Sequence, residues 1–163
     1  MIILGLDPGT ATTGYGLVEK INGDCSLVDF GIIETSRDLE AGARLNIIET
    51  ALEKIIKKYQ PDTAAVEKLF FHRNVTTAMK VSEARGVLIN TLAKMNISTH
   101  EYTPLQIKQA VTGSGASPKK EVQKMVGLLL KLKETPKPDD AADGLAIAIC
   151  CGHSLRIEAI NKV

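Results

Sequence analysis

The sequence predicts an α/β domain with a five-stranded mixed sheet flanked by helices. Five short apolar stretches have the length of strands, and from residue 39 onward stretches of helical period alternate with them. The first three strand-like stretches follow one another through short turns, which favours an antiparallel meander. The later strands are separated by helices, so a right-handed crossover can place the fourth strand parallel to the first.

The first strand is Ile2–Leu6, an apolar run without polar alternation, which is typical of a strand covered on both faces. It ends at Asp7, and the segment from Pro8 to Gly14 has the residues of a turn. A carboxylate at the carboxyl end of a central strand, before a glycine-rich turn, occupies the place where α/β sheets usually carry their chemistry.

Two further strands are predicted at residues 15–21 and 27–35, joined by the tight turn Asn22-Gly23-Asp24. A helix over residues 39–59 follows, because its apolar residues recur at helical spacing, and Pro61 ends it. The fourth strand, residues 63–66, is again followed by a carboxylate, Glu67. Parallel first and fourth strands would bring Asp7 and Glu67 side by side.

The second half of the chain is predicted to be mostly helical. A helix capped by Asn74 runs to about residue 94 and carries small residues on one side, and residues 97–101 form the fifth strand. Thr103-Pro104 and Ser117-Pro118 each open a helix with a capping residue and a first-turn proline, the second helix reaching about residue 133. The last helix spans about residues 139–156, with Asp139 as its N-cap.

Length and composition predict one domain over residues 1–163, with no apolar run long enough to span a membrane. Met1 leads directly into the first strand, which leaves no room for a signal peptide. Three cysteines, two of them adjacent, do not form a disulfide framework, so we expect a cytoplasmic protein without a membrane partner.

The net charge of +1 is spread unevenly along the chain. Residues 103–138 contain seven lysines against two glutamates. A basic segment beside an acidic remainder suggests a polyanion partner held next to a cation site, although a solvated helix face has the same composition.

Asp140 and Asp143 lie three residues apart, on one face of the first turn of the last helix. Capping and the helix dipole would explain such acids, but the sequence A-A-D-G-L-A-I-A-I predicts a buried helix, where a carboxylate needs a compensating charge. Together with Asp7 and Glu67 these acids select a hard cation, Mg²⁺ or Mn²⁺, and not zinc. Two such ions about 4 Å apart suit phosphodiester hydrolysis, but other acid-cluster phosphate chemistry needs the same residues.

The chain resembles the RuvC family of Holliday-junction resolvases in several stretches that occur in the same order. These are L-G-L-D-P-G-T-A-T-T-G-Y-G around Asp7, A-A-V-E-K-L-F-F around Glu67, E-A-R-G-V-L, Q-I-K-Q-A-V-T-G-S-G and D-D-A-A-D-G-L-A-I-A-I. The resemblance implies a ribonuclease-H-like fold, a homodimer, and an endonuclease that makes paired nicks in strands of like polarity at a four-way junction.

The resemblance also implies roles for single residues. Asp7, Glu67, Asp140 and Asp143 correspond to the catalytic acids and ligands of two Mg²⁺ ions, for which Mn²⁺ substitutes. The DNA-binding residues would be Phe70, Phe71, Arg73, Lys108, Lys119 and Lys120, with Phe70 as a wedge at the branch point. The small-residue side of the helix at 74–94 would lie at the dimer interface, and the branch-migration proteins RuvA and RuvB would be partners.

Three other interpretations compete with the resolvase. D-P-G-T-A-T-T-G resembles the phosphate loop of sugar kinases, but those proteins bind nucleotide between two domains, for which this chain is too short. A related nuclease of RNA processing and a junction-binding module with a degenerate centre are the others. The presence of all four acids speaks against a degenerate centre. Cys150, Cys151 and His153 look like metal ligands, but adjacent helical cysteines point about 100° apart and suit a core better.

Overall fold

The computed structural model describes residues 1–69 and 75–160 of the chain. Its ten elements are β1 (Ile2–Asp7), β2 (Thr12–Ile21), β3 (Asp24–Glu34), α1 (Ala41–Tyr59), β4 (Thr63–Glu67), α2 (Val75–Lys94), β5 (Ser98–Tyr102), α3 (Pro104–Thr112), α4 (Lys119–Leu129) and α5 (Asp139–Ile160). No helix among these residues is long and apolar enough to cross a membrane.

The five strands form one mixed sheet in the order β3-β2-β1-β4-β5. β1 and β3 both pair antiparallel with β2, whereas β1 and β4 pair parallel, as do β4 and β5. The predicted meander and the parallel placement of the fourth strand beside the first are therefore confirmed. Leu6 lies opposite Val66 in the parallel pair of β1 and β4. Asp7 and Glu67 are the next residues of these strands, so they lie at the same end of the sheet.

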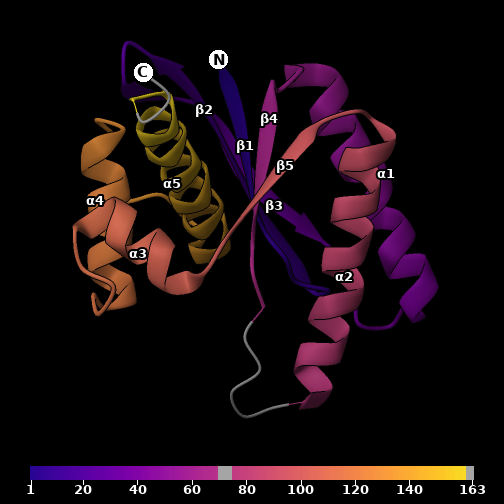
Figure 1. The fold of residues 1–163 in the computed structure, drawn as a ribbon. Coiled ribbons are helices and arrows are strands. Elements are labelled where there is room, and N and C mark those ends of the chain that lie inside the picture. Colours follow the sequence, from indigo (N-terminus) through magenta and orange to yellow (C-terminus); the bar gives the residue numbers. More distant parts are fainter. Residues whose placement is uncertain (70–74, 161–163) are drawn as a thin grey trace.

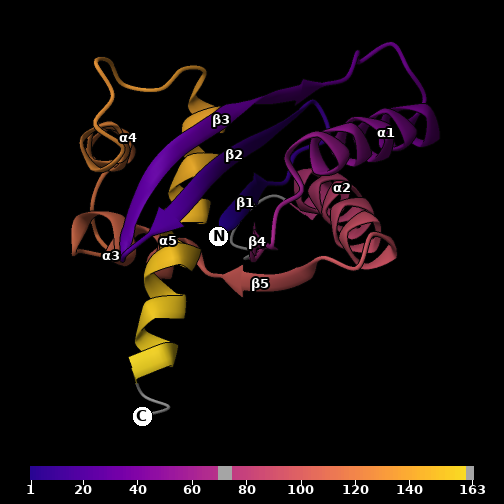
Figure 2. The ribbon, with the colours of Figure 1, turned by 90° about the horizontal axis from the view of Figure 1, so that it is seen from above.

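Helices cover both faces of the sheet, in three layers (Figures 1 and 2). α1 and α2 pack on one face, around a buried cluster that includes Leu4, Leu52 and Leu88. α3, α4 and α5 pack on the other, around a cluster that includes Ile3, Val126 and Leu145. Because β1 contributes Ile3 to one cluster and Leu4 to the other, its uninterrupted apolar sequence is explained by burial on both faces.

The second and third strands are longer than their predicted bounds. Each begins three residues earlier than predicted, β2 at Thr12 and β3 at Asp24. Asn22 and Gly23 have φ values of 52° and 98°, which suit a two-residue hairpin turn and let the ladder start at the Ile21–Asp24 pair. The polar residues at these strand ends belong to the sheet because their backbones pair with the neighbouring strand, which the local apolar pattern does not indicate.

Two predicted helix starts are wrong in detail. α4 begins at Lys119 after Pro118, without a side-chain cap from Ser117. In α5 the carbonyl oxygen of Pro138 accepts the N–H groups of Ala141 and Ala142, so Asp139 is the first helical residue and not the N-cap. The predicted cap of α3 at Thr103 is confirmed, and the structure adds a capping box in which the Gln106 side chain accepts the backbone N–H of Thr103.

The predicted helix ends also shift in α4 and α5. α4 stops at Leu129 rather than near residue 133, because Lys131 takes the left-handed conformation with φ of 55°. The N–H of Leu132 then donates back to the carbonyl of Gly127, which closes the helix end. α5 continues to Ile160, beyond the predicted end near residue 156.

The core-facing side of α2 differs from the side that carries Gly86 and Ala93. Ala84, Leu88 and Leu92 are fully buried and form the side that faces the core. Gly86 and Ala93 are exposed on another side, and a Cβ atom added to Gly86 would meet nothing within 4 Å. Among the described residues nothing covers Gly86 or Ala93, so both can contact another molecule.

Candidate functional site

Three of the four predicted acids converge at the end of β1. Asp7 ends that strand, and Asp140 and Asp143 lie in the first turns of α5, which crosses β1 and β2. One carboxylate oxygen of each lies within 4.8 Å of those of the other two, and all three residues are half-buried. Residues far apart in the sequence thus form one cluster of oxygen atoms.

Glycines allow α5 to lie close enough to the strands for this convergence. A Cβ atom on Gly14, next to the start of β2, would overlap the carbonyl oxygen of Asp140. A Cβ atom on Gly144 would lie 2.6 Å from the backbone carbonyl carbon of Tyr15 in β2. Because backbone meets backbone at both places, a side chain at either glycine would push the start of α5, and its two aspartates, away from Asp7.

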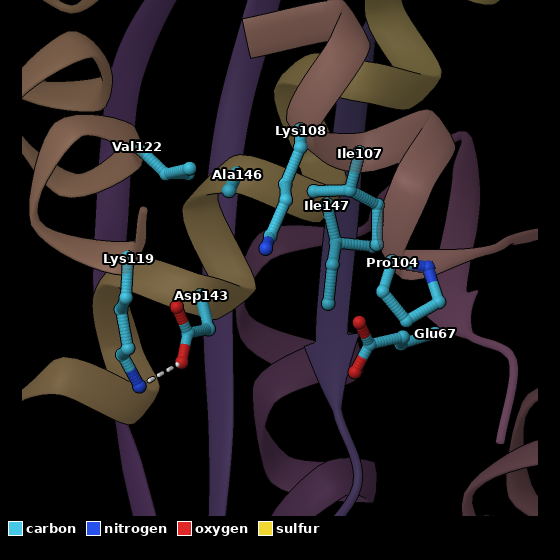
Figure 3. A pocket seen from close by; sticks show the side chains of 9 residues that line it. All are labelled: Glu67, Pro104, Ile107, Lys108, Lys119, Val122, Asp143, Ala146 and Ile147. Atoms are coloured by element: carbon cyan, nitrogen blue, oxygen red, sulfur yellow. Dashed lines mark hydrogen bonds and ion pairs between the residues drawn. The ribbon is translucent and has the colours of Figure 1, made fainter. Parts of the chain in front are cut away.

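Glu67 joins the site from β4 and lines a cavity of about 240 Å³ beside the three aspartates. Figure 3 shows Glu67 and Asp143 on its wall with Lys108 of α3 and Lys119 of α4. Pro104, Ile107 and Ile147 supply an apolar part of the wall. The cavity therefore carries both anionic and cationic groups on a partly apolar surface.

Asp7, Glu67 and Asp143 have raised pKa values, so they hold their protons more tightly than ordinary carboxyls. Burial, and then the charges of Glu67, Asp143 and Asp140, raise the pKa of Asp7 to about 8. Burial and the charge of Asp143 raise the pKa of Glu67 to about 7, although Lys119 and Lys108 oppose the rise. Burial also raises the pKa of Asp143. Excess negative charge concentrated in this way favours the binding of a cation.

The lysines predicted to bind DNA occupy different positions. The ammonium of Lys119 lies 2.7 Å from a carboxylate oxygen of Asp143 and 3.9 Å from one of Asp139. Lys108 lines the same cavity. Lys120, the next residue, is exposed and does not line it. Of this trio, Lys108 and Lys119 are placed beside the acids.

Arg85 of α2 contacts the backbone of Glu67, a contact that the sequence analysis does not predict. Its Nε donates to the carbonyl oxygen of Glu67 at 3.2 Å, and its guanidinium forms an ion pair with Glu101 of β5. The residue lies within the stretch E-A-R-G-V-L, but a lone arginine on a helix does not reveal which carbonyl it will meet. Arg85 fixes the chain where β4 ends, so it is a positioning residue.

Three predicted DNA-binding residues, Phe70, Phe71 and Arg73, lie outside the described residues. Cys150, Cys151 and His153, which look like metal ligands in the sequence, do lie among the described residues. Cys150 and Cys151 are buried in the core, and the Nδ1 atom of His153 lies 3.1 Å from the carbonyl oxygen of Ala110. The assignment of these cysteines to the core is confirmed.

The donors of the cluster fit a hard divalent cation. All are carboxylate oxygens, and in the described part of the chain Asp7, Asp140 and Asp143 form the one group of His, Cys, Asp or Glu side chains close enough to hold an ion together. Oxygen-only donor sets suit Mg²⁺ or Mn²⁺, whereas zinc prefers nitrogen and sulfur. Glu67, on the neighbouring strand end, can complete the set.

Comparisons with known proteins show the family to which this chain is related. The family described as "Crossover junction endodeoxyribonuclease RuvC" matches residues 3–151. A protein of that name from Heliobacterium modesticaldum is 53% identical over 155 residues, 95% of this chain and 96% of the relative. Another from Halothermothrix orenii is 52% identical over 157 residues, 96% of this chain and 95% of the relative.

A solved structure with similar architecture is "T. thermophilus RuvC in complex with Holliday junction substrate". It superposes with a TM-score of 0.91 at 33% sequence identity, covering 97% of this chain and 96% of that chain. The similarity therefore extends over nearly the whole of both chains.

Proposed function

This chain belongs to the RuvC family of crossover junction endodeoxyribonucleases, and on that premise we propose how its residues cut a four-way DNA junction. The protein is a nuclease that resolves Holliday junctions in DNA recombination and repair. The observation that carries the residue assignment is the convergence of carboxylate oxygens from β1 and α5 within 4.8 Å. Metal-assisted phosphodiester hydrolysis needs such a concentration of acids to hold the ions at the scissile phosphate.

Asp7, Glu67, Asp140 and Asp143 are proposed as the catalytic acids and metal ligands. Asp7 lies beside Asp140 and Asp143, with carboxylate oxygens within 4.8 Å, and the charges of these two and of Glu67 all raise its pKa. Two Mg²⁺ ions, or Mn²⁺ in their place, are the proposed metals. When bound, they stabilise the attacking water and the leaving oxygen. The carboxylates hold the metals and orient the attacking water, and the apolar wall of the cavity limits access of other water.

Lys108 and Lys119 are proposed to hold DNA phosphates beside the acids. Both line the cavity that contains Glu67 and Asp143, so a phosphodiester entering it meets an ammonium group and a carboxylate on the same wall. Lys119 already pairs with Asp143, and this pairing keeps its side chain directed into the site. Lys120 is proposed to contact the backbone farther out, since it is exposed. Such contacts provide affinity rather than sequence discrimination.

The resemblance supports a wedge at the branch point, formed by Phe70 with help from Phe71 and Arg73. Stacking on an unpaired base contributes about 1–3 kcal/mol, enough to help hold a junction open. Replacing Phe70 by alanine is expected to slow cutting of a junction more than it weakens binding, measured on the same labelled substrate. Equal cutting rates in the two proteins would remove Phe70 from the mechanism.

We propose a homodimer that joins through α2. Met79, Ser82, Gly86, Ile89 and Ala93 repeat at alternating spacings of four and three residues, and none of the five is buried in this chain. This heptad-like spacing with small side chains suits close packing of two helices. Two copies would supply two active sites related by a twofold axis, as paired, symmetric nicks require.

The remaining proposals concern the cellular setting. Residues 1–163 are proposed to act as a single nuclease domain, with the branch-migration proteins RuvA and RuvB as partners, implied by the family. Since the substrate is recombining DNA, the cytoplasm is the proposed location. Pull-down of RuvA and RuvB with a junction present tests the partnership, and its absence under those conditions would contradict it.

The decisive experiment compares a labelled synthetic four-way junction with a linear duplex, with Mg²⁺ and with EDTA. Symmetric nicks confined to the junction and dependent on Mg²⁺ are the expected result. Asp7→Asn should abolish cutting and leave junction binding intact, because the lysines do not need that carboxylate to bind phosphate. Cutting by Asp7→Asn at the wild-type rate would show that the catalytic centre lies elsewhere.

A further inference from the structure

A second cavity, of about 290 Å³, lies on the α1–α2 side of the molecule. Three cationic side chains from separate segments line it, together with one acid. Arg37 precedes α1, Arg44 lies in the first turn of α1, and Lys80 and Glu83 belong to α2. The lining thus carries three positive charges against one negative charge. Among the described residues, none of the three cations forms an ion pair.

Arg44 is held in place by the turn that follows the catalytic strand. Its Nε donates at 2.8 Å to the hydroxyl of Thr35, which is almost fully buried. That hydroxyl in turn donates to the carbonyl oxygen of Thr10, which itself lines the cavity. Thr10 lies three residues after Asp7. The position of the guanidinium is therefore linked through two hydrogen bonds to the segment that carries the central catalytic acid.

The two cavities lie on opposite sides of the acid cluster. Lys108 and Lys119 belong to α3 and α4, which cover one face of the sheet, whereas Arg44 and Lys80 belong to α1 and α2, which cover the other (Figure 2). Asp7 lies at the end of β1, between these layers. A DNA backbone that crosses the acids from one side to the other would pass from the first cavity to the second.

We propose that the second cavity binds a backbone phosphodiester of the junction DNA, on the side of the acids opposite Lys108 and Lys119. The site rests on the proposed function, because it needs DNA over Asp7. Guanidinium groups match the oxygens of a phosphate in geometry and in charge, and Arg37 and Lys80 have no partner in the described chain to displace. The negative charge of Glu83 opposes the three cations, so Glu83 lowers the affinity of the site for a phosphate.

The test measures binding of a labelled four-way junction to the full chain, in a buffer with Ca²⁺ or EDTA so that no strand is cut. Arg37→Gln should weaken binding about three- to tenfold at low salt and reduce the slope of log affinity against log salt by about 0.9. Lys54→Gln is the matched control. It removes the same positive charge, and Lys54 is exposed in the second half of α1, away from the cavity. This variant should bind as the wild type does.

A second variant should change the junction affinity in the opposite direction. A folding defect can only weaken binding, so it cannot imitate a gain in affinity. Glu83→Gln should tighten junction binding about twofold to fivefold, because it removes the one anion of the lining. The effects of Arg37→Gln and Glu83→Gln should be the same for junctions of different sequence, since a phosphate carries no base information. Binding by Arg37→Gln equal to that of Lys54→Gln, or an effect that depends on sequence, would overturn the proposal.

Failure of this inference is distinguishable from failure of the proposed function. If the wild type neither binds nor cuts the junction with Mg²⁺, the function is wrong whatever Arg37 does. If the wild type and Lys54→Gln cut the junction and Arg37→Gln needs no more protein for half-maximal cutting, only the second phosphate site is wrong. Support for the site is a higher half-maximal concentration for Arg37→Gln alone.

Discussion

At the carboxyl end of β1, the Asp7 carboxylate is half-buried beside Glu67, Asp143 and Asp140, and its pKa rises from the ordinary value of 3.8 to about 8. Between these values the folded protein retains a proton that the unfolded chain has released. The contribution of Asp7 to the free energy of unfolding therefore falls as the pH rises from about 4 to about 8. The same burial and charge that disfavour this carboxylate in the free protein favour a bound cation.

Replacing Asp7 by asparagine should therefore stabilise the metal-free protein at pH 8. In EDTA we expect a thermal midpoint higher by several degrees than that of the wild type, since about 1 kcal/mol shifts the midpoint of a domain this size by about 2–4 °C. The gain should shrink at pH 5, where the wild-type Asp7 is protonated. Differential scanning calorimetry at both pH values measures it.

Asp24→Asn is the control for this prediction, because Asp24 is an exposed carboxylate at the start of β3, away from the site. Its midpoint should not show the same rise between pH 5 and pH 8. A lower midpoint for Asp7→Asn than for the wild type at pH 8 would show that Asp7 is not strained by its neighbours.

At the scale of elements, the site depends on how closely α5 lies against β1 and β2. α5 packs across these strands with glycine facing backbone, Gly144 against Tyr15 and Gly14 against Asp140. Gly144 follows Asp143 directly, so the closest approach of the helix and the position of a catalytic acid are coupled. An average core position tolerates a change of one methyl group better than this backbone contact does.

Gly144→Ala should lower both stability and cutting. Alanine favours a helix by about 1 kcal/mol over glycine, but its Cβ atom would lie 2.6 Å from the backbone of Tyr15, so one element must move. We expect a loss of about 1–3 kcal/mol in the free energy of unfolding, measured by urea denaturation, and a fall of at least about tenfold in the rate of junction cutting.

Gly42→Ala in α1 is the matched control, because a Cβ atom there meets nothing within 4 Å. It changes the same residue type within a helix and should be neutral or stabilising. If Gly144→Ala were as stable and as active as Gly42→Ala, close contact between α5 and β2 would not be what positions Asp143.

At the scale of the whole molecule, the two helical layers carry different candidate sites. α3, α4 and α5 supply Lys108, Lys119 and Asp143 of the first cavity, to which β4 adds Glu67. α1 and α2 supply Arg44, Lys80 and Glu83 of the second cavity, and α2 carries the proposed dimer face. Arg85 connects the layers, since it lies on α2 and holds the carbonyl of Glu67. A contact between two copies through α2 would therefore lie one side chain away from the end of β4.

Gly86→Arg should separate the proposed dimer without unfolding the chain. Gly86 is exposed in the middle of the heptad-like seam, and an added side chain meets nothing in its own protomer. Sedimentation velocity should show a monomer at concentrations where the wild type is a dimer, with an unchanged circular dichroism spectrum. Junction cutting should then give single rather than paired nicks.

Gly42→Arg adds the same charged side chain to α1 and should leave the oligomeric state as in the wild type. A Gly86→Arg protein that sediments as the wild type does would remove α2 from the dimer interface. A monomeric wild type would remove the dimer altogether.

Local sequence was sufficient to predict most of the fold. The apolar run before Asp7, the Asn22-Gly23 turn and the cap at Thr103 each depend on a few adjacent residues, and each appears where expected. The pairing of β1 with β4 followed from the handedness of crossovers, so the neighbouring positions of Asp7 and Glu67 were also predictable. Local signals failed at the ends of elements, such as the stop of α4 at Leu129.

Sequence by itself thus determined the strands, the antiparallel meander, the parallel pairing of β1 with β4 and the choice of the four candidate acids, because these follow from periodicity, crossover handedness and residue chemistry along the chain. Tertiary structure alone decided which groups meet: Lys119 rather than Lys120 beside Asp143, Arg85 on the carbonyl of Glu67, and Arg44 on the turn after Asp7. These contacts join side chains from separate elements. Their direction depends on the packing of helices against the sheet, which no local pattern along the chain encodes.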